Sequence, residues 1–130
     1  MGASSLSAGS IVYDLLVSSE AVRAITTTIF PVAKEEAQLP YISYARKALR
    51  HEAVKGSSAC CGADTIEIDV NCYASDYATS VELAEAVRSA LDYQSYEGDE
   101  VSMRSCTLSN ASEYWECDAF VQSLTFVLNI

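Results

Sequence analysis

Two stretches of the chain place apolar residues at the spacing of an amphipathic helix. The first runs from Ala8 to Leu16, with Ser7 or an earlier serine as the expected N-cap, and a short helical turn follows over 20–25. The second lies over 77–92, where Ser75 or Asp76 is the expected cap. Its apolar stripe is formed by Leu83, Ala84, Val87, Ala90 and Leu91. The pattern therefore predicts two main helices, one near the start and one in the second half.

Alternating positions predict strands elsewhere, most clearly over 65–73. There Ile66, Ile68, Val70 and Cys72 fall on one face, and Thr65, Glu67, Asp69 and Asn71 on the other. Further extended segments are expected at 26–29, 41–50, 101–108 and 119–129. Polar residues and glycines predict a mobile hairpin loop over 51–64, and 109–118 is expected to be rich in turns. Residues 1–5 are expected to be frayed.

The order of these elements predicts a single α+β domain spanning residues 1–130. We expect a mainly antiparallel, mixed sheet of about four to five strands, with the two main helices packed on one face. Because the helix at 77–92 lies between two strands, it can act as a crossover that pairs them in parallel. A chain of 130 residues is long enough to bury a core without disulfides or metals.

Charge is distributed unevenly between the two halves of the chain. The formal net charge is −10, yet residues 1–63 carry five acids against six bases, whereas residues 64–130 carry thirteen acids against two. The negative balance disfavours a protein that coats nucleic acid or an anionic membrane by charge alone. Opposite charges on one subunit can instead meet on neighbouring copies. A coat of acids that keeps the surface soluble is the alternative.

Cysteine usage and the start of the chain bear on the compartment. The five cysteines are odd in number and have no CxxC spacing, and the first basic residue is Arg23, so no signal peptide is predicted. No apolar stretch is long enough to span a bilayer. We expect a protein with free thiols in the cytosol and no membrane partner, and assign no role to Cys60 and Cys61.

Few residues suggest catalysis or metal binding. The single histidine, His51, lies in the polar hairpin and is expected to be solvated rather than catalytic. Glu67 and Asp69 share one strand face, where they could hold a cation or simply form the wet side of a sheet, which we favour. No phosphate-binding glycine motif occurs. We therefore predict no enzyme, no cofactor and no metal site.

Two other groups of residues are candidates for contacts with partners. The basic cluster comprises Arg46, Lys47, Arg50, His51 and Lys55, which could pair with the acidic half of a neighbouring copy or remain solvated. Tyr114 and Trp115 stand in an acidic stretch, and such aromatics are enriched at interfaces, although a core position is an alternative.

Four stretches, taken in order, resemble a phage family. They are Val12–Leu16; Ile29–Pro31; Leu39–Tyr44; and Ile66–Val70 together with Ala84–Leu91. This series is similar to the tail completion or tail terminator proteins of long-tailed bacteriophages, from about residue 10 to the end. The acidic segment 109–118 and the double cysteine depart from that pattern.

The resemblance implies a non-enzymatic virion protein, assembled in the host cytoplasm and located in the tail or neck. Such proteins form a ring, expected to be a hexamer, at the head-proximal end of the tail tube. The implied partners are other copies of the chain, the tail tube protein and the head–tail connector or neck proteins. DNA passes through the ring without specific binding, and acidic residues around a bore would favour that passage.

The resemblance and the charge pattern together give a hypothesis for individual residues. Subunit or tube contacts are expected at Arg46, Lys47, Arg50, Lys55, Tyr114 and Trp115. Glu67 and Asp69 are expected to face the bore or an interface. Three alternatives remain. The first is a head–tail adaptor or minor tail protein of similar fold. The second is a cytosolic α+β ligand-binding module or small enzyme with Tyr41, Tyr44, Tyr73 and Tyr77 lining its pocket, and the third is an oligomerising domain with no site.

Overall fold

The computed structural model describes residues 5–33, 37–52, 63–98 and 101–130. A 3-10 turn at Ser5–Ser7 precedes the first helix. The elements that follow are α1 (Gly9–Ser18), α2 (Glu20–Arg23), β1 (Ile29–Pro31), β2 (Tyr41–Glu52), β3 (Ala63–Ala74), α3 (Tyr77–Leu91), β4 (Ser105–Glu116) and β5 (Ala119–Asn129). Both predicted main helices are present.

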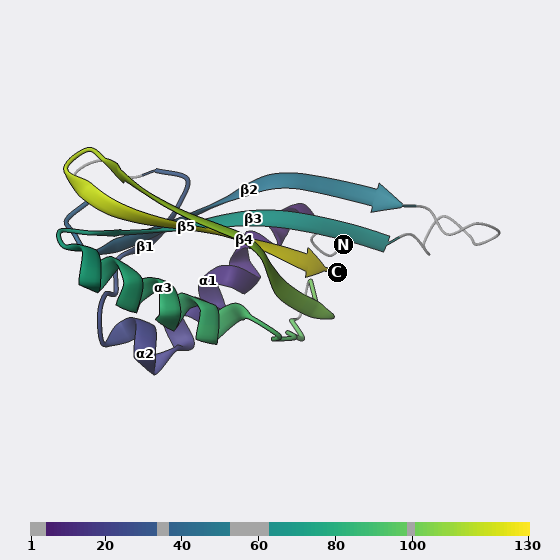
Figure 1. Cartoon of the computed structure of the whole chain (residues 1–130). Coiled ribbons are helices and arrows are strands. Elements are labelled where there is room, and N and C mark those ends of the chain that lie inside the picture. Colours follow the sequence, from purple (N-terminus) through teal and green to yellow (C-terminus); the bar gives the residue numbers. More distant parts are fainter. Residues whose placement is uncertain (1–4, 34–36, 53–62, 99–100) are drawn as a thin grey trace.

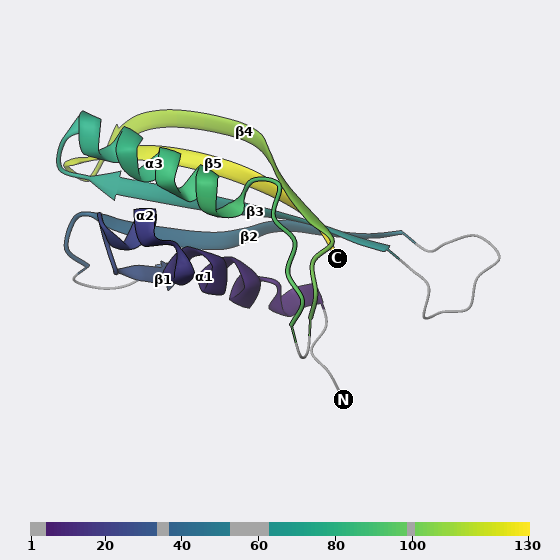
Figure 2. The same ribbon diagram turned by 90° about the horizontal axis from the view of Figure 1, so that it is seen from below.

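The five strands form one mixed sheet in the order β1-β2-β3-β5-β4. β1 pairs in parallel with β2, and every other neighbouring pair is antiparallel. The helices lie on one face of this sheet (Figures 1 and 2), where α3 contacts β3 and β5 and also packs against α1 and α2. The predicted α+β class is confirmed. We call the face opposite the helices the open face.

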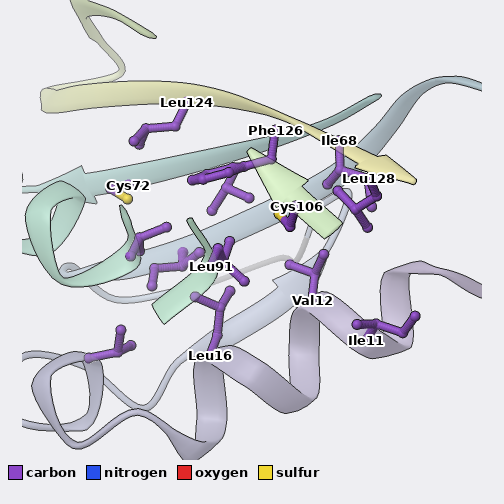
Figure 3. Close-up of a cluster of buried hydrophobic side chains, with 14 of the residues drawn as sticks. Ile11, Val12, Leu16, Ile68, Cys72, Leu91, Cys106, Leu124, Phe126 and Leu128 are labelled. Atoms are coloured by element: carbon purple, nitrogen blue, oxygen red, sulfur yellow. The ribbon is translucent and has the colours of Figure 1, made fainter. Parts of the chain in front are cut away.

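The core fills the space between the helices and the sheet (Figure 3). Ile68 of β3 and Phe126 of β5 meet Leu91 of α3 and Leu16 of α1, and all four side chains are fully buried. β3 supplies this layer with every second residue, because successive side chains of a strand point to opposite faces. The apolar residues of the alternation predicted for 65–73 thus pack the sheet against its helices.

The segment 109–118 was predicted to be turn-rich, which is wrong: most of it belongs to β4, and only Cys117 and Asp118 form the turn to β5. Residues 109–116 are exposed on both faces, so the strand carries no hydrophobic alternation. The preceding strand, expected over 101–108, begins at Ser105.

Three further expectations need correction. Position Ala8 caps α1 without a side-chain bond, because Ser5–Ser7 form a 3-10 turn of their own. α3 crosses between two strands of like direction, but β5 lies between them, so β3 and β4 do not pair. The loop predicted over 51–64 is strand at 51–52 and 63–64, and residues 53–62 lie outside the described residues. The Asp76 cap of α3 is confirmed.

Candidate functional site

The open face carries the polar set of β3 that the alternation predicted. Glu67 and Asp69 are both on it and both half-buried. Asp69 accepts a hydrogen bond from the Thr125 hydroxyl at 2.6 Å. Glu67 is the neighbouring residue on the same face of β3, two positions before Asp69. It lines a shallow depression together with Ala48, Arg50, Thr65 and Val127. The two acids share a surface, but each has different neighbours.

A row of aromatic side chains crosses the same face at the other end of the strands. The register places Tyr41, Tyr73, Val121 and Tyr114 side by side on four adjacent strands. Tyr41 and Tyr73 stack with ring centroids 4.5 Å apart. Burial, and then the neighbouring Tyr73, raises the pKa of Tyr41. This row is a fixed, partly desolvated surface and not a cavity.

The basic residues lie on the far half of β2, where the strand extends beyond β1. Arg46, Lys47 and Arg50 are all exposed. Arg46 lies on the helix-side face, and its Nη1 donates to the Leu6 carbonyl at 3.0 Å. Lys47 occupies a β-bulge, and Arg50 lies on the open face. The structure therefore spreads these side chains around both sides of the strand, and Lys55 lies outside the described residues.

Tyr114 and Trp115 are consecutive on β4 and therefore point to opposite faces. Trp115 is 57 % exposed and packs edge-on against Phe120, with ring centroids 4.9 Å apart. Tyr77 contacts Phe120 from α3, again edge-on. Together these three rings form an exposed aromatic ledge on the helix-side face, beside the β4–β5 turn.

A hydrogen-bonded network that the sequence did not suggest borders this ledge. Glu113 accepts from the Gln122 amide and from the Tyr77 hydroxyl, each at 2.9 Å. These bonds hold the pKa of Glu113 below its usual value and raise that of Tyr77. Glu113 and Gln122 lie opposite each other in the β4–β5 register. The sequence pattern predicts turns, not a strand, over 109–118, and therefore does not indicate this pair.

Strands β2 and β4 carry charges of opposite sign, whereas Asp64 and Glu67 of β3 lie beside the bases of β2. The bases of β2 lie in the half of that strand towards Glu52, whereas Glu113, Glu116 and Asp118 lie at or near the β4–β5 turn. Figure 1 shows the C-terminal end of β2 and the β4–β5 turn at opposite ends of the sheet. The register separates the two groups along the strands: Arg50 is level with Asn129, and Tyr41 is level with Tyr114. The bases of β2 and the acids of β4 are thus separated along the strands.

The tyrosines proposed to line a ligand pocket do not converge. Tyr41 and Tyr73 are on the open face, Tyr44 contacts Tyr13 of α1, and Tyr77 belongs to the ledge. His51 contacts Asp64 across the β2–β3 pair. Cys72 and Cys106 are buried, and burial raises the pKa of Cys106 to about 12.

No metal centre is present in the described part of the chain. Within it, no three side chains of histidine, cysteine, aspartate or glutamate are grouped as a metal ion would require. None of the helices described is both long enough and apolar enough to cross a membrane.

Comparison with known proteins places this arrangement among structural proteins of phage-like particles. A chain from the virion of a native gene transfer agent particle has the same fold, with a TM-score of 0.73 and 16 % sequence identity over 91 % of this chain and 90 % of that one. The family model for tail completion protein gp17 matches residues 11–127. The chain therefore belongs to the tail completion protein gp17 family and is a non-enzymatic structural protein of the virion. No curated protein matches it.

Proposed function

We propose that this chain assembles into a ring, expected to be a hexamer, at the head-proximal end of the tail tube. There it ends tube polymerisation and joins the tail to the head connector. The observation that carries this proposal is the opposite charge of two strands: Arg46, Lys47 and Arg50 on β2, and Glu113 and Glu116 on β4. Opposite charges at distant places on one subunit favour contacts between different surfaces, and such contacts close into rings.

The partners follow from this position. The ring contacts the tail tube protein on one side and the connector or neck proteins on the other. Subunit or tube contacts are assigned to Arg46, Lys47, Arg50 and Lys55 and to the aromatic pair Tyr114 and Trp115. All of these except Lys55, which lies outside the described residues, are exposed, as an interface in the free subunit requires.

DNA is proposed to pass through the ring without being bound. Glu67 and Asp69 lie on the open face, so they line the bore if this face turns inward, or a polar interface if it turns outward. Carboxylates repel phosphates by the same electrostatics that make basic grooves retain nucleic acid.

The test is reconstitution with purified tail tubes that lack this protein. Negative-stain imaging is expected to show a ring at one end of each tube, and added tube subunits no longer extend that end. A ring that binds the isolated connector but leaves tube growth unchanged would indicate an adaptor instead. Failure to form any ring, with or without tubes, would overturn the proposal.

A further inference from the structure

Over most of its length, the outer edge of β4 has no partner strand among the described residues. At its start, residues after α3 cover the edge: the Tyr93 N–H donates to the Cys106 carbonyl at 2.7 Å, and the Leu108 N–H donates to Asp92 Oδ1 at 3.0 Å. From Ser109 to Glu116, no strand in the described part of the chain pairs with that edge. A strand edge of this length is a template for another strand.

At the opposite edge of the sheet, half of β2 has no second partner strand in the part of the chain that the structure describes. β1 pairs only with Ile42, Ser43 and Tyr44. Beyond Tyr44, residues 45–52 have β3 on one side and no described strand on the other. Among the described residues, each subunit therefore has two strand stretches without a partner strand, one at each edge of its sheet.

Backbone groups on both stretches point outward in alternation. The two-residue turn at Cys117 and Asp118 makes Glu116 and Ala119 a hydrogen-bonded pair, so the N–H and C=O groups of Ala111, Glu113 and Trp115 face away from β5. On β2, the Ile42 N–H donates to the Thr28 carbonyl and the Tyr44 carbonyl accepts from the Val32 N–H. Because every second residue points its backbone groups to the same side, those of Arg46 also face away from β3.

We propose that residues 109–116 of β4 pair antiparallel with residues 45–52 of β2 in a second copy of this chain, so that the sheet continues from subunit to subunit. This inference rests on the proposed ring and specifies its contact. Strand direction fits: β4 runs opposite to β2 within the sheet, so a neighbour in the same orientation presents an antiparallel partner.

Charge selects this pairing over the two symmetric ones. Glu113 and Glu116 lie on the β4 stretch, and Arg46, Lys47 and Arg50 lie on the β2 stretch. Joining β4 to β4 brings acids together, and joining β2 to β2 brings bases together, whereas β4 on β2 joins opposite charges. The charges and the bulge at Lys47 are also devices that prevent indiscriminate edge pairing. Together they leave the heterologous contact that closes a ring.

Exposed apolar side chains support the same contact. In an antiparallel pair, the end of β4 lies next to the place where the neighbour's β1 ends. Trp115, near the end of β4, is 57 % exposed, and Val32, directly after β1, is 74 % exposed. The pairing brings these two side chains close together and removes both from water.

The first test uses a proline that the subunit tolerates. Ala111→Pro removes an outward N–H and leaves the β4–β5 bonds in place, as prolines on edge strands do. Ala111→Ser is the matched control, since it keeps the N–H. Assembly on tubes, measured by native mass and imaging, is expected to fall by about tenfold or more for the proline variant only. The melting temperature of the isolated subunit reports whether the fold is intact.

A second test uses charge reversal and remains informative even if the proline disturbs the fold. In this antiparallel pairing Glu116 comes opposite Ala45, two positions from Lys47 of the neighbouring β2. Glu116→Lys is expected to weaken assembly, and adding Lys47→Glu in the same chain is expected to restore it.

The outcomes separate this inference from the ring itself. Rings formed normally by a folded Ala111→Pro variant, or by Glu116→Lys, would overturn the strand pairing and leave the ring standing. Loss of assembly in Glu116→Lys that Lys47→Glu does not restore would also overturn the pairing. A wild-type chain that forms no ring would instead overturn the proposed function.

Discussion

At the scale of single residues, the β4–β5 turn holds two side chains in a conformation that suits glycine or asparagine. Cys117 has φ 50° and Asp118 has φ 60°. Both central positions of such a two-residue turn require positive φ, for which Asn-Gly is preferred. Replacing both residues by Asn-Gly (Cys117→Asn with Asp118→Gly) is expected to raise the free energy of unfolding by about 1 kcal/mol in urea denaturation. Asp118→Ala is the control and is not expected to stabilise the subunit. Equal stabilisation by both variants would show that positive φ at these two residues does not lower stability.

The helix cap gives a pH-dependent prediction at the same scale. Asp76 accepts from the backbone N–H of Thr79 at 3.0 Å and from its hydroxyl, and these bonds hold its pKa below the usual value. Because the folded pKa is the lower one, the cap stabilises fully above the unfolded pKa of about 4 and fades as pH falls through the folded pKa. Asp76→Ala is therefore expected to melt lower than wild type at neutral pH.

Thermal melts at several pH values test this cap. The difference between wild type and Asp76→Ala is expected to shrink below about pH 4. Asp76→Asn caps without titrating in this range, so its melting temperature is the control for acid effects elsewhere. A difference that is constant down to low pH would show that the carboxylate is not the stabilising group.

The faces of individual residues could be predicted where a strand is half-buried. The alternation of Ile66, Ile68 and Val70 correctly placed Glu67 and Asp69 on the opposite face. Arg46 and Arg50 lie on opposite faces of one strand because of the bulge at Lys47, which no local pattern marks. A bulge depends on the pairing of two strands, so the sequence of one strand does not reveal it.

At the scale of elements, Asp92 joins the end of α3 to β4. Its carboxylate accepts from the Leu108 N–H at 3.0 Å and from Arg88 Nε at 3.2 Å, and its side chain is only 9 % exposed. Asp92→Ala leaves a partly buried N–H without this acceptor, and is expected to cost about 2 kcal/mol in denaturant unfolding.

Arg88→Ala is the matched control for this junction. The Arg88 side chain is 52 % exposed, so its pair with Asp92 is screened by water and its removal is expected to cost less than about 1 kcal/mol. If both variants lose the same stability, the bond to Leu108 contributes nothing beyond the ion pair.

The element that sequence patterns missed is the one that the interface proposals need. Ser109–Glu116 has exposed residues on both faces, as suits an edge strand, so neither hydrophobic period nor turn glycine identified it. α3 and β3 could be predicted because each buries one face against the other layer. The hydrophobic pattern of a sequence marks the residues that face the core. An edge strand that is exposed on both faces has no such pattern.

At the scale of the whole molecule, salt is expected to act oppositely on the subunit and on its assembly. A net charge of −10 repels itself in the folded subunit, so added salt raises its melting temperature. The proposed contacts between β2 bases and β4 acids involve exposed side chains, and the Debye screening length shortens from about 10 Å at 0.1 M to about 3 Å at 1 M salt. Native mass and tube binding should therefore weaken with salt while the subunit becomes more stable.

A charge variant shows whether the same residues cause the loss of assembly. Lys47→Glu with Arg50→Glu removes the basic side of the contact, so the variant is expected to assemble poorly at low salt and to lose little more as salt rises. Arg23→Glu, an exposed base on α2 away from both strand edges, is the control and is expected to keep the wild-type salt dependence. Assembly that strengthens with salt in the wild type would indicate an apolar contact, since hydrophobic burial is not screened. In that case Trp115 and Val32, rather than the charges, would hold neighbouring subunits together.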